Sequence, residues 1–129
     1  MLNIYENIVF PLTLDGRKPD EELLRSIISF LRLEDLLDAF PGELSGGQQQ
    51  RAAIARALIA KPPVVLADEP TGNLDTIAGR DVMALLRMMS KKYGQTVVMI
   101  THNEELAQMA DQIIRLEDGK IVGEHHAGE

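Results

Sequence analysis

Residues 44–51 read Leu-Ser-Gly-Gly-Gln-Gln-Gln-Arg, and residues 64–69 read Val-Val-Leu-Ala-Asp-Glu. Ser45 is a favoured helix N-cap, and Gln48 stands at the spacing of a capping box. The pair Pro62-Pro63 separates the helix from the apolar run, because proline is not tolerated in a helix interior. The order predicts a long helix, followed by a strand that ends in two carboxylates.

Two glycines, Gly46 and Gly47, open this helix, which we expect to run to about Ala60. Glycine has no side chain, so the first backbone N–H groups stay accessible. A helix start carries bare N–H groups and the positive end of the helix dipole, and it therefore attracts anions such as phosphate. The residues leave two interpretations open: a phosphate-binding helix start, or a well-capped structural helix whose glycines permit close packing.

The acidic pair Asp68-Glu69 closes the first apolar run. Residues 64–67 are entirely apolar, as expected for a strand covered on both faces of a parallel sheet. Ligands of open α/β sheets gather at the carboxyl ends of the strands. Because side chains alternate along a strand, one carboxylate can serve the water shell of Mg²⁺ while the other orients an attacking water. The alternative is an acidic pair at a solvated strand end.

A second buried strand is expected at 96–101, with the apolar run 97–100 at its centre, and His102 directly follows it. The histidine therefore occupies the same place relative to its strand as the acidic pair does. A lone histidine is usually structural or on the surface, but one at the carboxyl end of such a strand is a candidate functional group. The pair His125-His126 lacks an evident third metal ligand, and we expect the tail 125–129 to be frayed.

The residues before the glycine helix read as a small helical unit. A short helix is expected from Tyr5, and Pro11 should disturb it. A further short helix is expected over 34–40, and Pro41-Gly42 should stop it. Between these two, Asp20 is the expected cap of a helix whose apolar face is formed by Leu23, Leu24, Ile27, Ile28 and Leu31.

The later elements follow from caps and turns. Residues 70–73 predict a turn, Asp75 is the expected cap of the next helix, and Gly94 is its expected C-terminal glycine. The methionines of that helix are expected to fill the core rather than a site. Two short strands within 112–124 are expected to pair as a hairpin through Asp118-Gly119.

Composition excludes several classes of protein. The 129 residues carry a net charge of -7, which argues against a broad nucleic-acid surface, since such a surface needs clustered Lys and Arg. The sequence has no cysteine, so disulfides and thiolate metal sites are excluded. The apolar runs are far shorter than the roughly 18 residues of a membrane helix, and the start lacks a signal-peptide pattern. Any membrane role must therefore come through a partner.

Four motifs together resemble those of the nucleotide-binding domain of ABC transporter ATPases. Leu44 to Gln48 matches the family signature LSGGQ, and 64–69 looks like the Walker B strand. The dipeptide Leu74-Asp75 matches the D-loop, and His102 matches the switch histidine. Because their order and spacing match as well, the combination is far more specific than any one motif.

The run 68–75, together with Tyr5-Glu6-Asn7, is similar to the subgroup that serves lipoprotein release, macrolide export and related MacB-like permeases. The resemblance implies an α/β fold, a partial P-loop NTPase-like ABC ATPase core. It assigns 1–60 to a helical subdomain that ends in the signature helix, and 61–129 to the C-terminal part of the core.

The sequence departs from the family pattern in one respect. It contains no G-x-x-x-x-G-K-[ST], so the P-loop lysine and the backbone cradle for the β- and γ-phosphates are absent. The adenine-stacking aromatic residue and the Q-loop glutamine lie upstream in the family and have no place here. We therefore expect the C-terminal half of such a domain, as a truncated gene, a split subunit or a cut fragment.

The resemblance also implies roles for individual residues. In the family, ATP and Mg²⁺ are sandwiched between two domains that face head to tail. Asp68 would hold Mg²⁺ through water, Glu69 would act as general base or orient the water, His102 would contact the γ-phosphate, and Asp75 would join the two halves of the dimer. The reaction is phosphoryl transfer to water. The γ-phosphate of a nucleotide held by the partner would contact Ser45, Gly46, Gly47 and Gln48.

The implied partners are a membrane permease subunit and a second ATPase domain or N-terminal half. The expected location is the cytoplasm, at the inner face of the membrane through the permease, without direct insertion. The apolar strands 64–67 and 97–100 would lack neighbours, and open strand edges pair readily, so we expect a dimer or a swapped assembly. The transported substrate cannot be read, because the permease selects it.

Two hypotheses of different classes remain at this point. The first is the ATPase component of a transporter, incomplete as it stands, and the intact Glu69 and His102 favour it. The second is a non-catalytic interaction module that docks on a permease or a partner ATPase, and the missing P-loop favours it.

The isolated chain is predicted to hydrolyse no MgATP. Without the P-loop, the triphosphate lacks the N–H cradle and the lysine that supply most of its binding. The measurement is phosphate release by the purified chain over a long incubation. Steady release that scales with the concentration of this chain would contradict the prediction.

Overall fold

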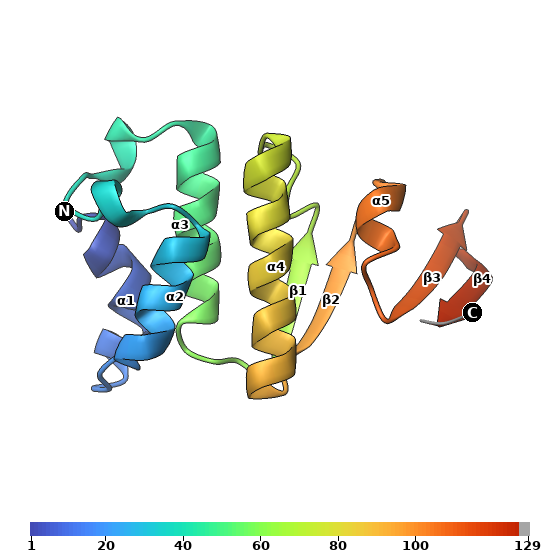
Figure 1. Ribbon diagram of the computed structural model, residues 1–129, viewed down its shortest axis with the longest axis horizontal. Helices are drawn as coiled ribbons and strands as arrows, with labels where there is room; N and C mark the ends of the chain where they lie inside the picture. Colours follow the sequence, from blue (N-terminus) through green and yellow to red (C-terminus); the bar gives the residue numbers. More distant parts are fainter. Residues whose placement is uncertain (127–129) are drawn as a thin grey trace. The chain divides into compact units, whose positions relative to one another are not determined.

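The computed structural model describes residues 1–126, in which residues 1–99 form one compact unit and a second unit begins at Ile100. The elements are shown in Figure 1. Their bounds are α1 Ile4–Leu14, α2 Glu21–Phe30, α3 Gly46–Leu58, β1 Val64–Asp68, α4 Thr76–Tyr93, β2 Thr96–Ile100, α5 Glu104–Ala107, β3 Gln112–Glu117 and β4 Lys120–His126, with single 3₁₀ turns at Glu34–Leu36 and Pro41–Glu43.

The core of the first unit lies between its helices. Helix α3 contacts α1 and α2, and α2 also contacts α4. Each helix turns one apolar stripe inward, and the small residues Ala52 and Ala55 let the neighbours of α3 approach closely. The expected apolar face of α2 is confirmed, and Met83 and Met89 of α4 are buried in the core, as expected. The largest side chains with no more than 1% exposure are Ile8, Leu23, Ile27, Leu31, Leu33, Leu58, Leu85, Met89 and Val82.

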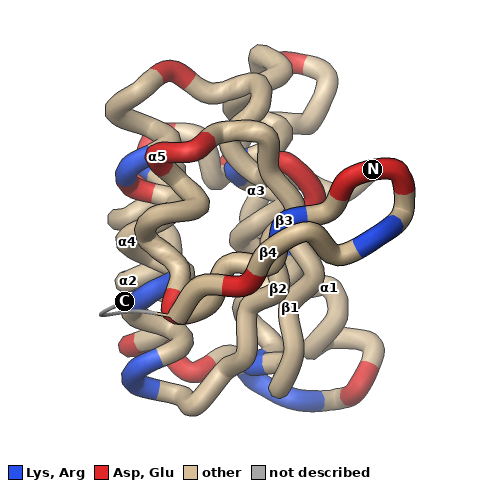
Figure 2. Tube along the Cα trace, turned by 90° about the vertical axis from the view of Figure 1, so that its right-hand side faces the viewer, with Lys and Arg blue, Asp and Glu red and all other residues tan. Residues whose placement is uncertain are grey.

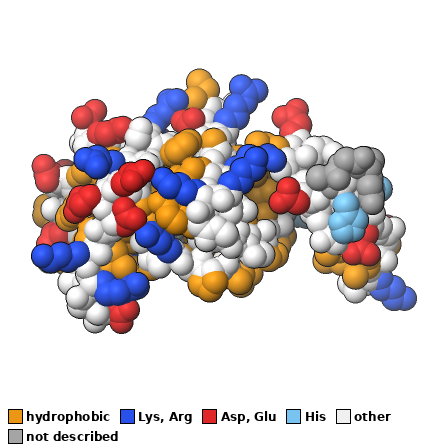
Figure 3. Space-filling view, turned by 60° about the horizontal axis from the view of Figure 1, so that its bottom comes forward, with side chains coloured by type: hydrophobic (Ala, Val, Ile, Leu, Met, Phe, Trp, Pro, Cys, Tyr) orange, Lys and Arg blue, Asp and Glu red, His pale blue; other side chains and the backbone are white. Residues whose placement is uncertain are grey.

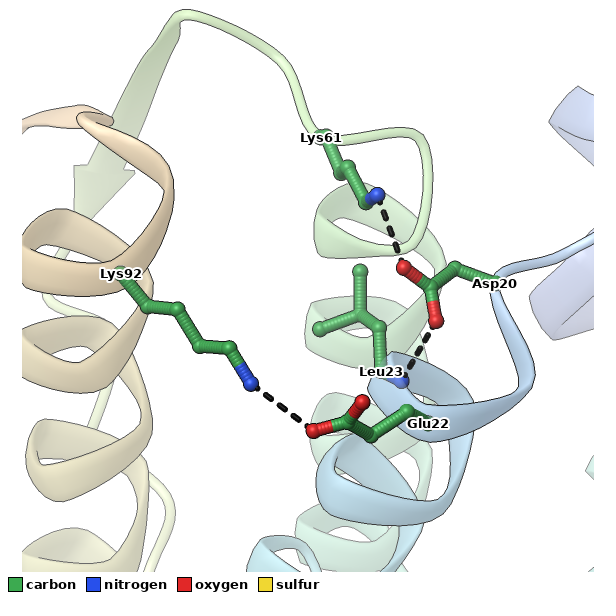
Figure 4. A network of polar contacts seen from close by, with 5 residues as sticks. All are labelled: Asp20, Glu22, Leu23, Lys61 and Lys92. Atoms are coloured by element: carbon green, nitrogen blue, oxygen red, sulfur yellow. Dashed lines mark hydrogen bonds and ion pairs between the residues drawn. The ribbon is translucent and has the colours of Figure 1, made fainter.

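The start of α2 makes one capping hydrogen bond and two ion pairs to other segments (Figure 4). Asp20 caps the helix by accepting from the Leu23 N–H at 3.1 Å, as the sequence predicts. The same carboxylate pairs with Lys61, which follows α3, at 2.9 Å. Glu22 pairs with Lys92 at the end of α4, at 3.0 Å. These side chains are exposed or partly exposed, so the contacts orient the helices more than they stabilise them.

Strands β1 and β2 form a two-stranded sheet, joined by α4 and pointing the same way in Figure 1. The expectation that the first strand is covered on both faces is wrong. Alternate side chains face the surface: Val64 is 51% exposed, Leu66 79% and Val98 48%. A two-stranded sheet with one crossover helix can bury only one face. Figure 3 shows apolar side chains at the surface between the charged ones.

Two expectations about the first 43 residues are also wrong. Helix α1 runs through Pro11 to Leu14 without ending. The missing N–H forfeits one hydrogen bond, and the burial of Val9 and Leu12 on either side offsets this loss. The helix expected over 34–40 is only a 3₁₀ turn, and Pro41 begins another such turn instead of simply ending a helix.

The second unit contains α5 and a β3–β4 hairpin. The strands pair antiparallel from Gln112 opposite His126 to Glu117 opposite Lys120, with an irregularity after Arg115. Asp118 and Gly119 both have positive φ, of 49° and 76°, which confirms the expected hairpin turn. Residues 125 and 126 belong to β4, so the expectation of a frayed tail is wrong for them. The rest of that tail lies outside the described residues.

Within residues 1–126, neither charged residues of one sign nor apolar helical residues form a long uniform stretch. Basic and acidic segments alternate along the trace in Figure 2 rather than gathering in one basic stripe. No helix within residues 1–126 is long and apolar enough to cross a membrane.

The Asp20–Lys61 pair makes stability depend on pH. The hydrogen bond from Lys61 lowers the pKa of Asp20 below its ordinary value of 3.8. The resulting stability is fully present above that value and is lost as the pH falls through the lower folded pKa. The variant Asp20→Asn keeps a capping oxygen but loses the charge. It should unfold at lower urea than the unmodified chain at neutral pH, and the gap should close below pH 3.8.

The matched control for this experiment is Glu21→Gln. Glu21 is an exposed acid in the same first turn, and no ion pair joins it to another described residue. Its urea midpoint should follow that of the unmodified chain at every pH. A constant gap between Asp20→Asn and the unmodified chain from pH 7 to pH 3 would show that the ion pair does not contribute.

Candidate functional site

The start of α3 has the geometry that the sequence predicts. The Ser45 Oγ accepts from the Gln48 N–H at 3.2 Å, and the Gln48 Oε1 accepts from the Ser45 N–H at 2.9 Å. This reciprocal capping box uses the Gln48 N–H and leaves the N–H groups of the two glycines for another acceptor. Ser45 and Gly46 are exposed, so the helix start faces solvent.

The two glycines have different surroundings. A Cβ built on Gly46 would meet no atom within 4 Å. A Cβ on Gly47 would lie 3.3 Å from the Asn73 carbonyl oxygen and 3.5 Å from the Leu74 Cδ2. Gly46 thus leaves open space for a ligand. Gly47 packs closely on the turn 70–74, which agrees with the packing interpretation for that residue. Phosphate binding at the helix start stays a prediction.

The acidic pair stands at a sharp turn. Asp68 is the last residue of β1 and is exposed. Glu69 has a φ of 47°, in the left-handed region that costs a non-glycine residue on the order of 1 kcal/mol. The turn closes when the Gly72 N–H donates to the Glu69 carbonyl at 3.1 Å. The different directions expected for the two carboxylates stay a prediction.

Helices α3 and α4 hold this turn from both sides. The Gln50 Nε2 donates to the carbonyl of Pro70, which is buried. On the other side, Gly79 of α4 lies where a Cβ would be 3.5 Å from the Thr71 Cβ. The sequence reasoning did not single out Gln50 or Gly79. Neither has a motif signal of its own, and only the packing reveals them.

A groove of about 240 Å³ lies beside the turn. Helices α3 and α4 and strand β1 line it, almost entirely with apolar side chains. Gln50 and Asp68 are the polar exceptions among its lining residues, so the groove reaches from the signature helix to the first carboxylate.

Asp75 caps α4, as expected, by accepting from the Ala78 N–H at 2.8 Å. It is exposed, and the preceding Leu74 is half-buried beside Gly47. The D-loop residues therefore lie next to the signature helix of the same chain. The role of Asp75 across a dimer stays a prediction.

His102 lies in the second unit, two residues beyond the end of β2, and it is exposed. The segment around it is well defined: the Asn103 N–H donates to the Thr101 Oγ1 at 3.0 Å, and Asn103 caps α5. The two guanidinium nitrogens of Arg115 pair with the Glu104 carboxylate, which lowers the pKa of Glu104 and raises that of Arg115. The expected contact of His102 with the γ-phosphate stays a prediction.

The residues fit half of a nucleotide site. The open helix start at Gly46 suits a phosphate, and the exposed Asp68 suits a Mg²⁺ ion that is held through water. Within residues 1–126, no group of three or more acidic, histidine or cysteine side chains could hold a metal ion. The remaining ligands of such an ion must come from water, phosphate or another chain.

A glycine helix start packed on the turn after an acidic strand end places the chain among partial α/β domains of the ATPase type. The family described as "ABC transporter" matches residues 1–72. The chain therefore belongs to the ABC transporter family.

Individual relatives agree with this family assignment. The chain is 46% identical over 130 positions to the ABC transporter ATP-binding protein YxdL of Bacillus subtilis, covering 99% of this chain and 51% of YxdL. It is 42% identical to the lipoprotein-releasing system ATP-binding protein LolD 1 of Rhodopseudomonas palustris, covering 92% of this chain and 54% of LolD 1. These relatives are consistent with the predicted membership of this chain in the MacB-like and lipoprotein-release subgroup.

Solved structures confirm the partial ABC ATPase fold. The dimeric structure of MJ0796, a bacterial ABC transporter cassette, matches with a TM-score of 0.81 and 39% identity. The match covers 98% of this chain and 57% of MJ0796. The chain spans about half the length of these curated relatives, as the motif content predicts.

A pair of glycine variants tests the division of roles at the start of α3. Gly47→Ala should be less stable than Gly46→Ala by roughly 1 kcal/mol, because its Cβ crowds the Asn73 carbonyl while Gly46 has free space. Urea unfolding of both variants measures the difference. Equal stability of the two variants would mean that the turn 70–74 does not rest on Gly47.

Proposed function

We propose that this chain forms part of an ATP-binding, ATP-hydrolysing subunit of an ABC transporter and drives transport through a partner permease. The observation that carries the proposal is the packing of the signature helix start onto the turn that bears Asp68 and Glu69, within one compact unit. The family match and the ATP-binding relatives support it.

Each residue would act on one side of a shared site. Glu69 would accept a proton from, or orient, the attacking water, and Asp68 would hold Mg²⁺ through water. His102 would donate to the γ-phosphate. Bound MgATP supplies the phosphoryl group and its charge, and the chemistry is mainly positioning and charge stabilisation. The nucleotide of the facing domain would be contacted by the helix start formed by Ser45, Gly46, Gly47 and Gln48.

The chain cannot complete such a site alone, because its sequence has no P-loop. We infer that the N-terminal half of the domain, which these 129 residues do not contain, completes the site, and that Asp75 helps to join two assembled domains. MJ0796 was solved as a dimer and in a post-hydrolysis state bound to ADP and Pi, which supports a dimeric ATPase here. The exposed apolar side chains of β1 and β2 are a further reason to expect association.

We place the assembly at the cytoplasmic face of a membrane, held there by its permease. The helical part, 1–60, would transmit the contact with the permease, and 61–129 would carry the hydrolytic groups. The missing P-loop also favours a second candidate, a non-catalytic module that docks on a permease or a partner ATPase without turnover.

Complementation distinguishes the two candidates. The purified chain is titrated with MgATP in a calorimeter, with and without the separately made part of MJ0796 that this chain does not match. The ATPase assignment predicts binding and phosphate release only in the mixture. The docking module predicts neither in either sample. Binding by the chain alone would contradict the inferred dependence on a P-loop.

Glu69→Gln provides the matched test within the mixture. Removal of a general base should lower turnover at least about 100-fold while MgATP still binds. Glu34→Gln, an exposed acid in a 3₁₀ turn, is the control and should leave turnover unchanged. Full activity of Glu69→Gln would show that this carboxylate is not the base.

A further inference from the structure

We propose that Gln50 is a positioning residue that locks the signature helix to the turn carrying Glu69, so that both move as one rigid piece. The inference deepens the proposed function and rests on it. Gln50 lies outside the four signature residues and touches no reacting group. Its effect on catalysis would pass through the backbone of Pro70.

The hydrogen bond from Gln50 joins positions far apart in the sequence. Its Nε2 donates to the Pro70 carbonyl across 20 residues, and the contact is partly buried. Pro70 itself is buried and directly follows Glu69. The bond lies at the edge of an apolar groove, where few other polar lining groups compete for the carbonyl.

A second contact lies on the same face of α3. Gly47 stands three residues before Gln50, and positions three apart share one helix face. Gly47 packs against the Asn73 carbonyl and the Leu74 side chain. The turn is therefore held near both of its ends by one face of the helix, so a tilt of the helix start must carry the turn with it.

The turn needs this support. Glu69 has a left-handed backbone, and such a conformation persists only when the surroundings over-determine it. Two internal hydrogen bonds close the turn: Gly72 N–H to the Glu69 carbonyl and Leu74 N–H to the Thr71 carbonyl, both at 3.1 Å. Without the Gln50 contact, the Pro70 carbonyl would lose its link to α3, and the direction of the Glu69 side chain would be less restricted.

The neighbouring Gln49 makes a matched control. It also donates from its Nε2 to backbone carbonyls, of Pro41 at 2.8 Å and Leu44 at 3.3 Å. These acceptors precede the helix and lie outside the turn. Replacing either glutamine by methionine keeps the side-chain length and the helix propensity and removes only the donor.

Amide hydrogen exchange by NMR on the chain itself tests the link. Gln50→Met should raise the exchange rates of the Gly72 and Leu74 amides about fivefold, the effect of losing one typical hydrogen bond. Gln49→Met should leave both rates unchanged. Gln50→Lys, which keeps an N–H donor at similar reach, should restore them. Gln50→Glu removes the donor with almost no change in shape, and it serves if the methionine variant fails to fold.

Turnover tests the catalytic consequence, in the mixture with the N-terminal part of MJ0796. Gln50→Met should lower kcat at least about tenfold and leave KM for MgATP within twofold, because positioning acts on the reacting geometry rather than on nucleotide binding. Gln49→Met should change neither value. Gln50→Lys should recover kcat, which a loss of general stability would not explain.

The outcomes distinguish a failure of the proposed Gln50 link from a failure of the proposed ATPase function. Unchanged exchange at Gly72 and Leu74 in Gln50→Met overturns the link itself, whatever the turnover. A loss confined to KM overturns the positioning role. An unmodified mixture that binds and hydrolyses no ATP overturns the proposed function, and with it the catalytic part of this inference.

Discussion

Burial of the apolar stripe of α3 is the interaction on which the first unit depends. Ala55 and Leu58 are fully buried, and α1 and α2 pack against this helix. Burying one leucine side chain contributes roughly 2 kcal/mol, and the small alanines allow the close approach. Arg56 adds a contact with the Phe10 ring at 5.5 Å. The opposite end of the same helix carries the capping box, so the position of the site follows from the packing of the core.

The candidate site joins a rigid element to a strained one. The helix start is regular and well capped, whereas the turn after β1 places Glu69 in the left-handed region. Strain of this kind is tolerated where neighbouring contacts compensate for it. Here these contacts come from Gly47 and Gln50 of α3 and from Gly79 of α4. The acidic pair and the signature helix are thus linked mechanically as well as by their order in the sequence.

Within the described residues, strands β1 and β2 leave apolar side chains exposed. Leu66 and Val98 stay exposed. In the relatives, about half of the length has no counterpart in this chain. In the proposed ATPase, residues beyond these 129 would therefore have two separate tasks: to supply the P-loop and to cover apolar surface.

The sequence alone determined the helix caps and the hairpin turn. The caps at Asp20, Ser45 and Asp75 and the turn at Asp118-Gly119 depend on neighbours within a few residues, so their residue types are sufficient to predict them. The motifs defined the family for the same reason. Burial and long-range contact were decided only by the tertiary structure. Continuation of α1 through Pro11, exposure of Leu66 and the reach of Gln50 to Pro70 depend on partners distant in the chain, and no local pattern records these.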